Sequence, residues 1–122
     1  MKKLILGCLL LSAAAVSDAQ TKITPDDAAK HIGDSVSVCG KVFGGKWLEQ
    51  SKGQPTLLNM GAAFPNSPFT VVLFPAARQM FKEAPEVFYT NKEVCVLGTI
   101  KDYKGKPQIE VTNPDQISEV KQ

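Results

Sequence analysis

The sequence predicts an all-β domain of five strands, with a short helix at its start and another between the third and fourth strands. Short runs that alternate apolar and polar residues recur along the chain, as they do in half-buried strands. Clusters of glycine, proline and asparagine separate these runs. The composition, 43% hydrophobic and 21% charged over 122 residues, fits one globular domain and disfavours disordered, collagen-like and coiled-coil chains.

Residues 1–19 have the organisation of a secretory signal peptide. Three residues with two lysines precede the apolar run Leu4 to Val16, and small residues at 17–19 predict cleavage before Gln20. A membrane anchor is one alternative, but the apolar run is shorter than the roughly 20 residues of a span. A lipoprotein signal ending at Cys8 is another, with only three apolar residues before its Gly-Cys pair. We expect a periplasmic or secreted protein with no membrane span after cleavage.

Cleavage leaves one domain, residues 20–122, and lowers the formal net charge from +2 to +1 because two lysines and one aspartate are removed. General nucleic-acid binders carry a clear basic excess, so an anionic ligand would need a local cluster of lysines. One histidine and three cysteines predict no metal site and no cofactor. The sequence contains no catalytic motif or evident nucleophile–base pair, so we expect no enzyme.

The first elements have clear local signals. Thr24 is placed as an N-cap before Pro25, which predicts a short helix that ends near Gly33. Residues 35–43 alternate as a half-buried strand, and Gly44-Gly45 then begins either a loop or a kinked continuation of it. The later elements are a second strand at Pro55–Met60, a loop at Gly61–Pro68, a buried third strand at Phe69–Phe74, a two-turn helix at Ala76–Lys82, a fourth strand at Glu93–Lys101, a turn at Asp102–Lys106, a fifth strand at Gln108–Thr112 and an extended segment at Gln116–Val120.

Five strands with a helix between the third and fourth is the order of an OB-fold Greek-key barrel. The first and fourth predicted strands share the pattern Val-x-Val-x-Gly, with Gly40 and Gly98 in mid-strand. A glycine there suits a sharp bend or close packing, which a small barrel requires. A β-sandwich with two incidental glycines is the alternative.

Several runs of the chain carry a family resemblance, and they cover nearly all of residues 20–122. They are Ile23–Ala29 leading into Ile32–Val42, Leu58–Gly61 with Phe64–Asn66, Phe69–Val72, and Val94–Ile100 with Tyr103–Ile109. These runs resemble small exported bacterial OB-fold proteins of the nucleic-acid-binding (tRNA-anticodon-binding-like) type. The resemblance implies single-stranded nucleic acid as the ligand, although this fold also serves oligosaccharides, small molecules and proteins.

Cys39 and Cys95 remain after cleavage, and an even pair in an exported chain predicts a disulfide. In the barrel order the first and fourth strands pair, and both cysteines project from the face opposite their valines. A cross-strand bond is then expected if the register brings their Cβ atoms to about 4 Å. Free buried thiols are one alternative. A redox-active pair is another, but the chain lacks the C-x-x-C spacing and a base beside either cysteine.

OB-fold ligands meet the outer face of the second and third strands and the two loops beside it. Lysines for phosphates and exposed rings for base stacking gather near both loops, which we expect to be neighbours. The candidate ligand-binding residues are Lys41, Lys46, Trp47, Lys52, Asn59, Lys101, Tyr103, Lys104 and Lys106.

Each candidate also has a structural interpretation. The lysines can simply solvate turns, Trp47 can plug one end of the barrel, Tyr103 can cap it, and Asn59 can shape a turn. Two other functions stay open for the same fold. One is a periplasmic module for a small molecule or oligosaccharide, and the other is an envelope protein-interaction module using an apolar patch with Phe64 and Trp47.

Overall fold

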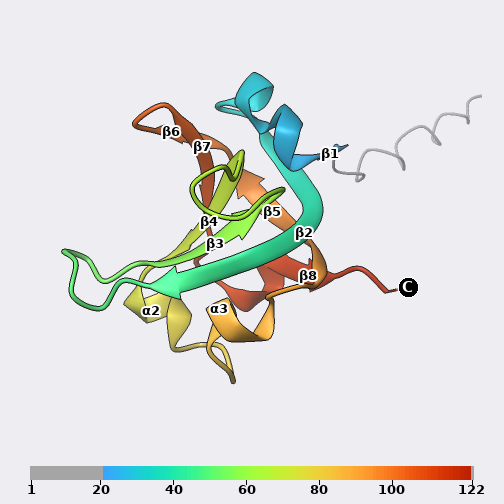
Figure 1. The fold of residues 1–122 in the computed structure, drawn as a ribbon. Helices are drawn as coiled ribbons and strands as arrows, with labels where there is room; N and C mark the ends of the chain where they lie inside the picture. Colours follow the sequence, from blue (N-terminus) through green and yellow to red (C-terminus); the bar gives the residue numbers. More distant parts are fainter. Residues whose placement is uncertain (1–20, 122) are drawn as a thin grey trace, which may run out of the picture.

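A computed structural model describes residues 21–121 of the chain. The predicted signal peptide therefore lies outside the described residues. Within residues 21–121, eight strands and four short helices follow one another (Figure 1). The strands are β1 (Lys22–Ile23), β2 (Ser35–Trp47), β3 (Thr56–Met60), β4 (Phe69–Leu73), β5 (Glu93–Thr99), β6 (Lys101–Tyr103), β7 (Lys106–Glu110) and β8 (Ile117–Glu119). The helices are η3 (Pro25–His31), α2 (Pro75–Arg78), α3 (Pro85–Phe88) and η4 (Pro114–Gln116).

The strands form one mixed sheet in the order β6-β7-β4-β3-β2-β5-β8, with β1 paired beside β2. The β4–β7 and β1–β2 pairs are parallel and the others are antiparallel. The predicted all-β class is confirmed. The structure has one open sheet of eight strands, whereas the sequence predicts five. The difference arises because β1, β6 and β8 are short additional strands.

The long strand β2 serves two parts of the sheet. Its first half, from Ser35 to Lys41, pairs with β5, and its second half, from Val42 to Trp47, pairs with β3. The register of this pairing shifts between Val42 and Gly44. Gly44 has a φ of 138°, a conformation that glycine adopts readily and that strains other residues. The glycine pair therefore bends a continuous strand. Of the two alternatives that the sequence leaves open after residue 43, a loop or a kinked continuation of the strand, the structure shows the continuation.

The mid-strand glycines of β2 and β5 allow close packing. A Cβ atom on Gly40 would lie 2.7 Å from Pro25 Cγ, and one on Gly98 would lie 2.5 Å from Ile109 Cγ2. Both distances are too short for a side chain, so η3 and β7 approach the backbone only because these residues are glycines. Of the two roles considered from the sequence, a sharp bend or close packing, the structure shows close packing at both positions.

The predicted fourth strand is split by one buried residue. Ile100 lies between β5 and β6, and its side chain is fully buried. Its N–H donates to Asp34 O at 3.0 Å, and its carbonyl accepts from Gly33 N at 2.7 Å. These bonds tie Ile100 to the segment before β2, so the ladder between β2 and β5 stops at Thr99.

The helices differ from the prediction in form. The first is a 3-10 helix, and Thr24 makes no side-chain cap bond to its backbone. The helix predicted at Ala76–Lys82 is only one turn long, since α2 ends at Arg78. A second four-residue helix, α3, follows outside the predicted range, and each helix has a proline in its first turn. The short helices allow Phe81 and Phe88 to pack against the core, and this tertiary packing overrides local helix propensity.

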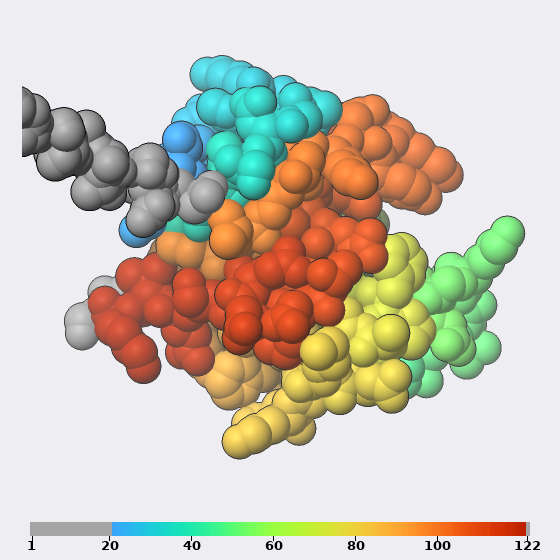
Figure 2. Space-filling model, turned by 180° about the vertical axis from the view of Figure 1, so that it is seen from behind, coloured from blue at the N-terminus to red at the C-terminus, as the bar shows by residue number. Residues whose placement is uncertain are grey.

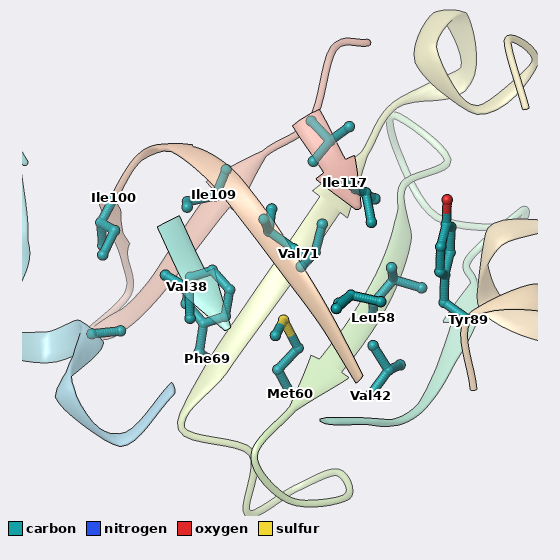
Figure 3. Close-up of a cluster of buried hydrophobic side chains, with 14 of the residues drawn as sticks. Val38, Val42, Leu58, Met60, Phe69, Val71, Tyr89, Ile100, Ile109 and Ile117 are labelled. Carbon is teal, nitrogen blue, oxygen red and sulfur yellow. The ribbon is translucent and has the colours of Figure 1, made fainter. Parts of the chain in front are cut away.

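The core lies between the strands and is shared by both halves of the sheet (Figure 3). Side chains from β2, β3, β4, β5 and β7 meet there, while α2 and α3 lie at one end of the sheet and η3 at the other (Figure 1). Its largest fully buried members are Phe69, Leu58, Met60, Leu73, Ile100 and Ile109.

The predicted disulfide is present. Cys39 and Cys95 are directly opposite each other in the β2–β5 ladder, with a Cα–Cα distance of 4.0 Å and an S–S distance of 2.06 Å. The bond lies on the sheet face opposite the buried Val38 and Val96, as the alternation of the two strands predicts.

Candidate functional site

The register of the sheet collects polar and cationic residues on the face away from the core, which we call the outer face. Lys46 of β2 pairs with Leu57 of β3, and one row further along Asn59 pairs with Thr70 of β4. Their strand neighbours Leu58 and Val71 are buried in the core, so these residues point to the opposite side. The outer face consists of Gly44, Lys46, Leu57, Asn59, Thr70, Val72, Lys101, Tyr103, Lys106, Gln108 and Glu110.

The β6–β7 hairpin adds lysines to the same face. Lys101 pairs with Gln108, which in turn is the β7 partner of Thr70, and Tyr103 pairs with Lys106. Tyr103 is 56% exposed, which does not match the barrel-capping interpretation. Lys104 lies in the turn of the hairpin, and its Nζ is 5.3 Å from the centre of the Tyr103 ring. The hairpin therefore presents an exposed aromatic ring with the ammonium group of Lys104 beside it and Lys106 as its cross-strand partner.

An open pocket of about 460 Å³ lies at the β2–β3 part of the outer face. Phe43 and Phe64 contribute two aromatic rings to it, and both are exposed to solvent, by 41% and 77%. Lys41 joins this region because its Nζ lies 5.0 Å from the centre of the Phe43 ring. The pocket is lined by Phe43, Gly44, Gly45, Lys46, Leu48, Leu57, Asn59 and Phe64.

Phe43 is a candidate that the sequence reasoning missed. Its position has the same parity as Ser37, Cys39 and Lys41, which is the polar side of the strand. An aromatic residue at an outward position just before the glycine pair was the available signal. Phe64 entered the sequence analysis in the family resemblance and in an apolar patch but not as a ligand-binding candidate, whereas the structure joins it to Asn59 in one pocket.

Trp47 lies on the inner side of the strand. It pairs with the buried Thr56, and the Arg78 guanidinium carbon lies 3.8 Å from the centre of its ring. Arg78 Nη1 donates to Thr56 Oγ1 at 2.8 Å and to Glu86 Oε1 at 2.6 Å, and Nη2 donates to Glu86 Oε2 at 3.2 Å. The Trp47 indole nitrogen is buried and has no acceptor among residues 21–121. Trp47 thus belongs to the packing between β2 and α2–α3, separate from the lysines of the outer face.

The two loops predicted to be neighbours project from the same side of the molecule but lie apart. In Figure 1 the hairpin between β6 and β7 and the loop after β2 extend at different corners, and Figure 2 shows them again as separate projections. Lys52 lies in the loop after β2, at residues 48–55, and is exposed. The structure thus groups Lys46, Asn59, Lys101, Tyr103 and Lys106 on the outer face, with Lys41 and Lys104 beside it.

The residues that the structure describes were also compared with the requirements of a metal site and of a membrane span. Across residues 21–121 no cluster of three or more histidine, cysteine or acidic side chains is arranged to hold a metal ion. No helix in the same range has the length and apolar character of a membrane span. The outer face offers ammonium groups, aromatic rings and amides, which bind ligands by charge, stacking and hydrogen bonds.

Comparison with known proteins yields a similarity of fold. No family model matches the chain, and no curated protein matches it. Among solved structures, the chain is similar to one described as an aspartyl-tRNA synthetase from Leishmania major Friedlin, with a TM-score of 0.54 and 13% sequence identity. The match covers 88% of this chain and 22% of the other, so the chain spans about a fifth of that protein's length. At this identity the likeness is one of fold alone.

Proposed function

We propose that this protein is a non-catalytic, exported OB-fold protein that binds single-stranded nucleic acid on its outer face. The observation that carries the proposal is the register. It aligns Lys46, Lys101 and Lys106 with the exposed ring of Tyr103 and with the pocket of Phe43. Ammonium groups beside exposed rings are the combination that single-strand binding uses, because phosphates attract the former and bases stack on the latter.

A five-stranded barrel is part of the proposal. The strand order β7-β4-β3-β2-β5, with β3 and β4 antiparallel and β4 and β7 parallel, follows the OB-fold path. Only Ile100 separates β5 from β6, and β6 pairs with β7. The barrel would then close through β5 and β6 acting as one strand, which pairs with β2 at one end and with β7 at the other. The fold similarity to a tRNA synthetase, a protein named for its action on tRNA, is compatible with this function.

Export is proposed from the leader-like residues 1–19 together with the disulfide, because disulfides persist mainly in oxidising compartments. The intact mass of the protein recovered from the periplasmic or secreted fraction tests it. A chain that begins at Gln20 is expected, and a chain that keeps residues 1–19 contradicts it.

The binding proposal is tested by fluorescence anisotropy with labelled single-stranded DNA and RNA of about 12 nucleotides, between roughly 50 and 200 mM salt. We expect affinity to fall steeply with salt. Replacing three hairpin lysines (K101Q/K104Q/K106Q) should weaken binding to every sequence and reduce the slope of log K against log salt by about 2, since each neutralised phosphate contributes about 0.7.

A variant that removes three exposed lysines elsewhere (K22Q/K30Q/K82Q) is the matched control and should leave the slope nearly unchanged. Equal effects of the two variants would mean that the hairpin holds no phosphate. Binding that does not depend on salt would support the oligosaccharide or small-molecule alternative, and the absence of binding would overturn the proposal. A concentration-dependent mass without oligonucleotide binding would support the protein-interaction alternative.

A further inference from the structure

The outer face contains one pocket that combines two aromatic rings, an amide and a lysine. We infer that the pocket between Phe43 and Phe64 holds a single nucleobase, and that the Asn59 amide donates a hydrogen bond to a carbonyl oxygen on the edge of that base. This inference rests on the proposed function and specifies one subsite within it.

The two rings provide surfaces for a flat ligand. Phe43 and Phe64 line one pocket, and both are exposed although they are large and apolar. Aromatic ring pairs in contact within residues 21–121 involve Phe81, Phe88 and Tyr89, so Phe43 and Phe64 do not stack on each other. Lys41 Nζ lies over one face of the Phe43 ring, so a flat base would stack on the other face of that ring and on the exposed ring of Phe64.

Asn59 supplies a directional polar group on the pocket wall. Its Oδ1 accepts a hydrogen bond from Ser67 Oγ at 3.2 Å, and Ser67 is buried. This bond engages the amide oxygen and leaves Nδ2 as a donor, and none of the hydrogen bonds found among residues 21–121 uses Nδ2. A ligand carbonyl can satisfy this donor, as can the oxygens of thymine, uracil, cytosine or guanine.

The charge of the pocket distinguishes a nucleotide from an apolar protein segment. Lys46 is the charged lining residue, Lys41 approaches the Phe43 ring, and no carboxylate lines the pocket. Phosphates on either side of a bound base would meet these ammonium groups. An aliphatic side chain would instead cover the Asn59 donor without a partner, at a cost of about 1–3 kcal/mol.

The test compares oligothymidylate with oligoadenylate of the same length, because thymine carries edge carbonyls and adenine has none. The Asn59→Leu variant should bind oligothymidylate roughly 3- to 10-fold more weakly, the equivalent of one hydrogen bond, and bind oligoadenylate within about twofold of wild type. Gln79→Leu is the matched control, since Gln79 is an exposed amide that belongs neither to the outer face nor to the pocket. Phe64→Ala should weaken binding of both strands by at least about fivefold through lost stacking.

A second measurement covers the case in which Asn59→Leu does not fold. In the wild-type protein, the side-chain amide NMR signals of Asn59 should shift on adding oligothymidylate and shift much less with oligoadenylate. Binding of both strands with no effect of Asn59→Leu, or equal losses for both, would overturn the base subsite and leave the proposed function standing. If no oligonucleotide binds to wild type, the proposed function and this inference both fail.

Discussion

The disulfide between β2 and β5 allows a quantitative prediction about stability. It joins Cys39 and Cys95 at a sequence separation of 56, so it closes a long loop in the unfolded chain. We consider the double variant C39A/C95A, which removes the bond and leaves no free thiol at either position. The partners pair within an intact ladder, so the folded structure should survive the change while the unfolded chain gains freedom.

The magnitude follows from the length of this loop. In the chain-entropy model, closing a loop of this length removes about 14 cal/mol/K from the unfolded state, which corresponds to about 4 kcal/mol at 25 °C. Small domains have a free energy of unfolding of only about 5–15 kcal/mol. The double variant should therefore lose a large fraction of its stability and still fold in the absence of denaturant if the wild type lies in the middle of that range.

Trp47 provides the assay, because it is the only tryptophan and packs between β2 and Arg78. Its fluorescence is followed during urea unfolding of the oxidised wild type, the reduced wild type and C39A/C95A. The last two should agree and lie about 4 kcal/mol below the first. A difference below about 1 kcal/mol would refute the reasoning, since it would mean that the unfolded chain is already restricted without the bond.

Two further predictions concern buried charge and pH. Glu86→Ala removes the partner of Arg78, whose side chain is 16% exposed, and should cost about 1–3 kcal/mol in urea unfolding, whereas Ala at the exposed Glu83 should cost less than about 0.5 kcal/mol. Equal costs would contradict a structural role for the ion pair. Burial, and secondarily the Glu119 carboxylate, raise the pKa of Tyr89 above 10.0. The neutral phenol is thus favoured by folding, so this contribution is complete below pH 10 and is lost as pH rises above it. Wild type should lose stability more steeply than Tyr89→Phe in this range, and parallel pH profiles would contradict the assignment.

Local patterns in the sequence were sufficient for the main strands and the disulfide, but not for the short strands β1, β6 and β8. Alternation assigns Val38 to the core and Cys39 to the opposite side, and the same holds for Val96 and Cys95. Because side chains in a strand alternate with period two, facing pairs of this kind follow once the strands pair in register. The early end of the predicted helix at Arg78 could not be predicted in this way, since Phe81 packs against a core built by residues distant in the sequence.

The outer face could be predicted from the sequence only in part. The sequence predicts lysines and rings near the outer surface, and Lys46, Lys101 and Lys106 do share one side of the sheet. Trp47 was placed with them as an adjacent candidate, yet it faces inward, whereas Phe43 reaches the pocket instead. Sequence distance to a lysine is a poor guide here, because neighbours in a strand point to opposite sides.

The sequence by itself thus determined the all-β class, the alternating core and the pairing of the cysteines, since each depends on local periodicity and on which residues share a face. Tertiary structure decided which exposed residues meet. The bulge between Val42 and Gly44 sets the register of β2 against β3, and the loop that carries Phe64 lies beside Asn59 because it connects the paired strands β3 and β4. A pocket formed by residues from separate segments depends on this register, and local sequence patterns do not encode it.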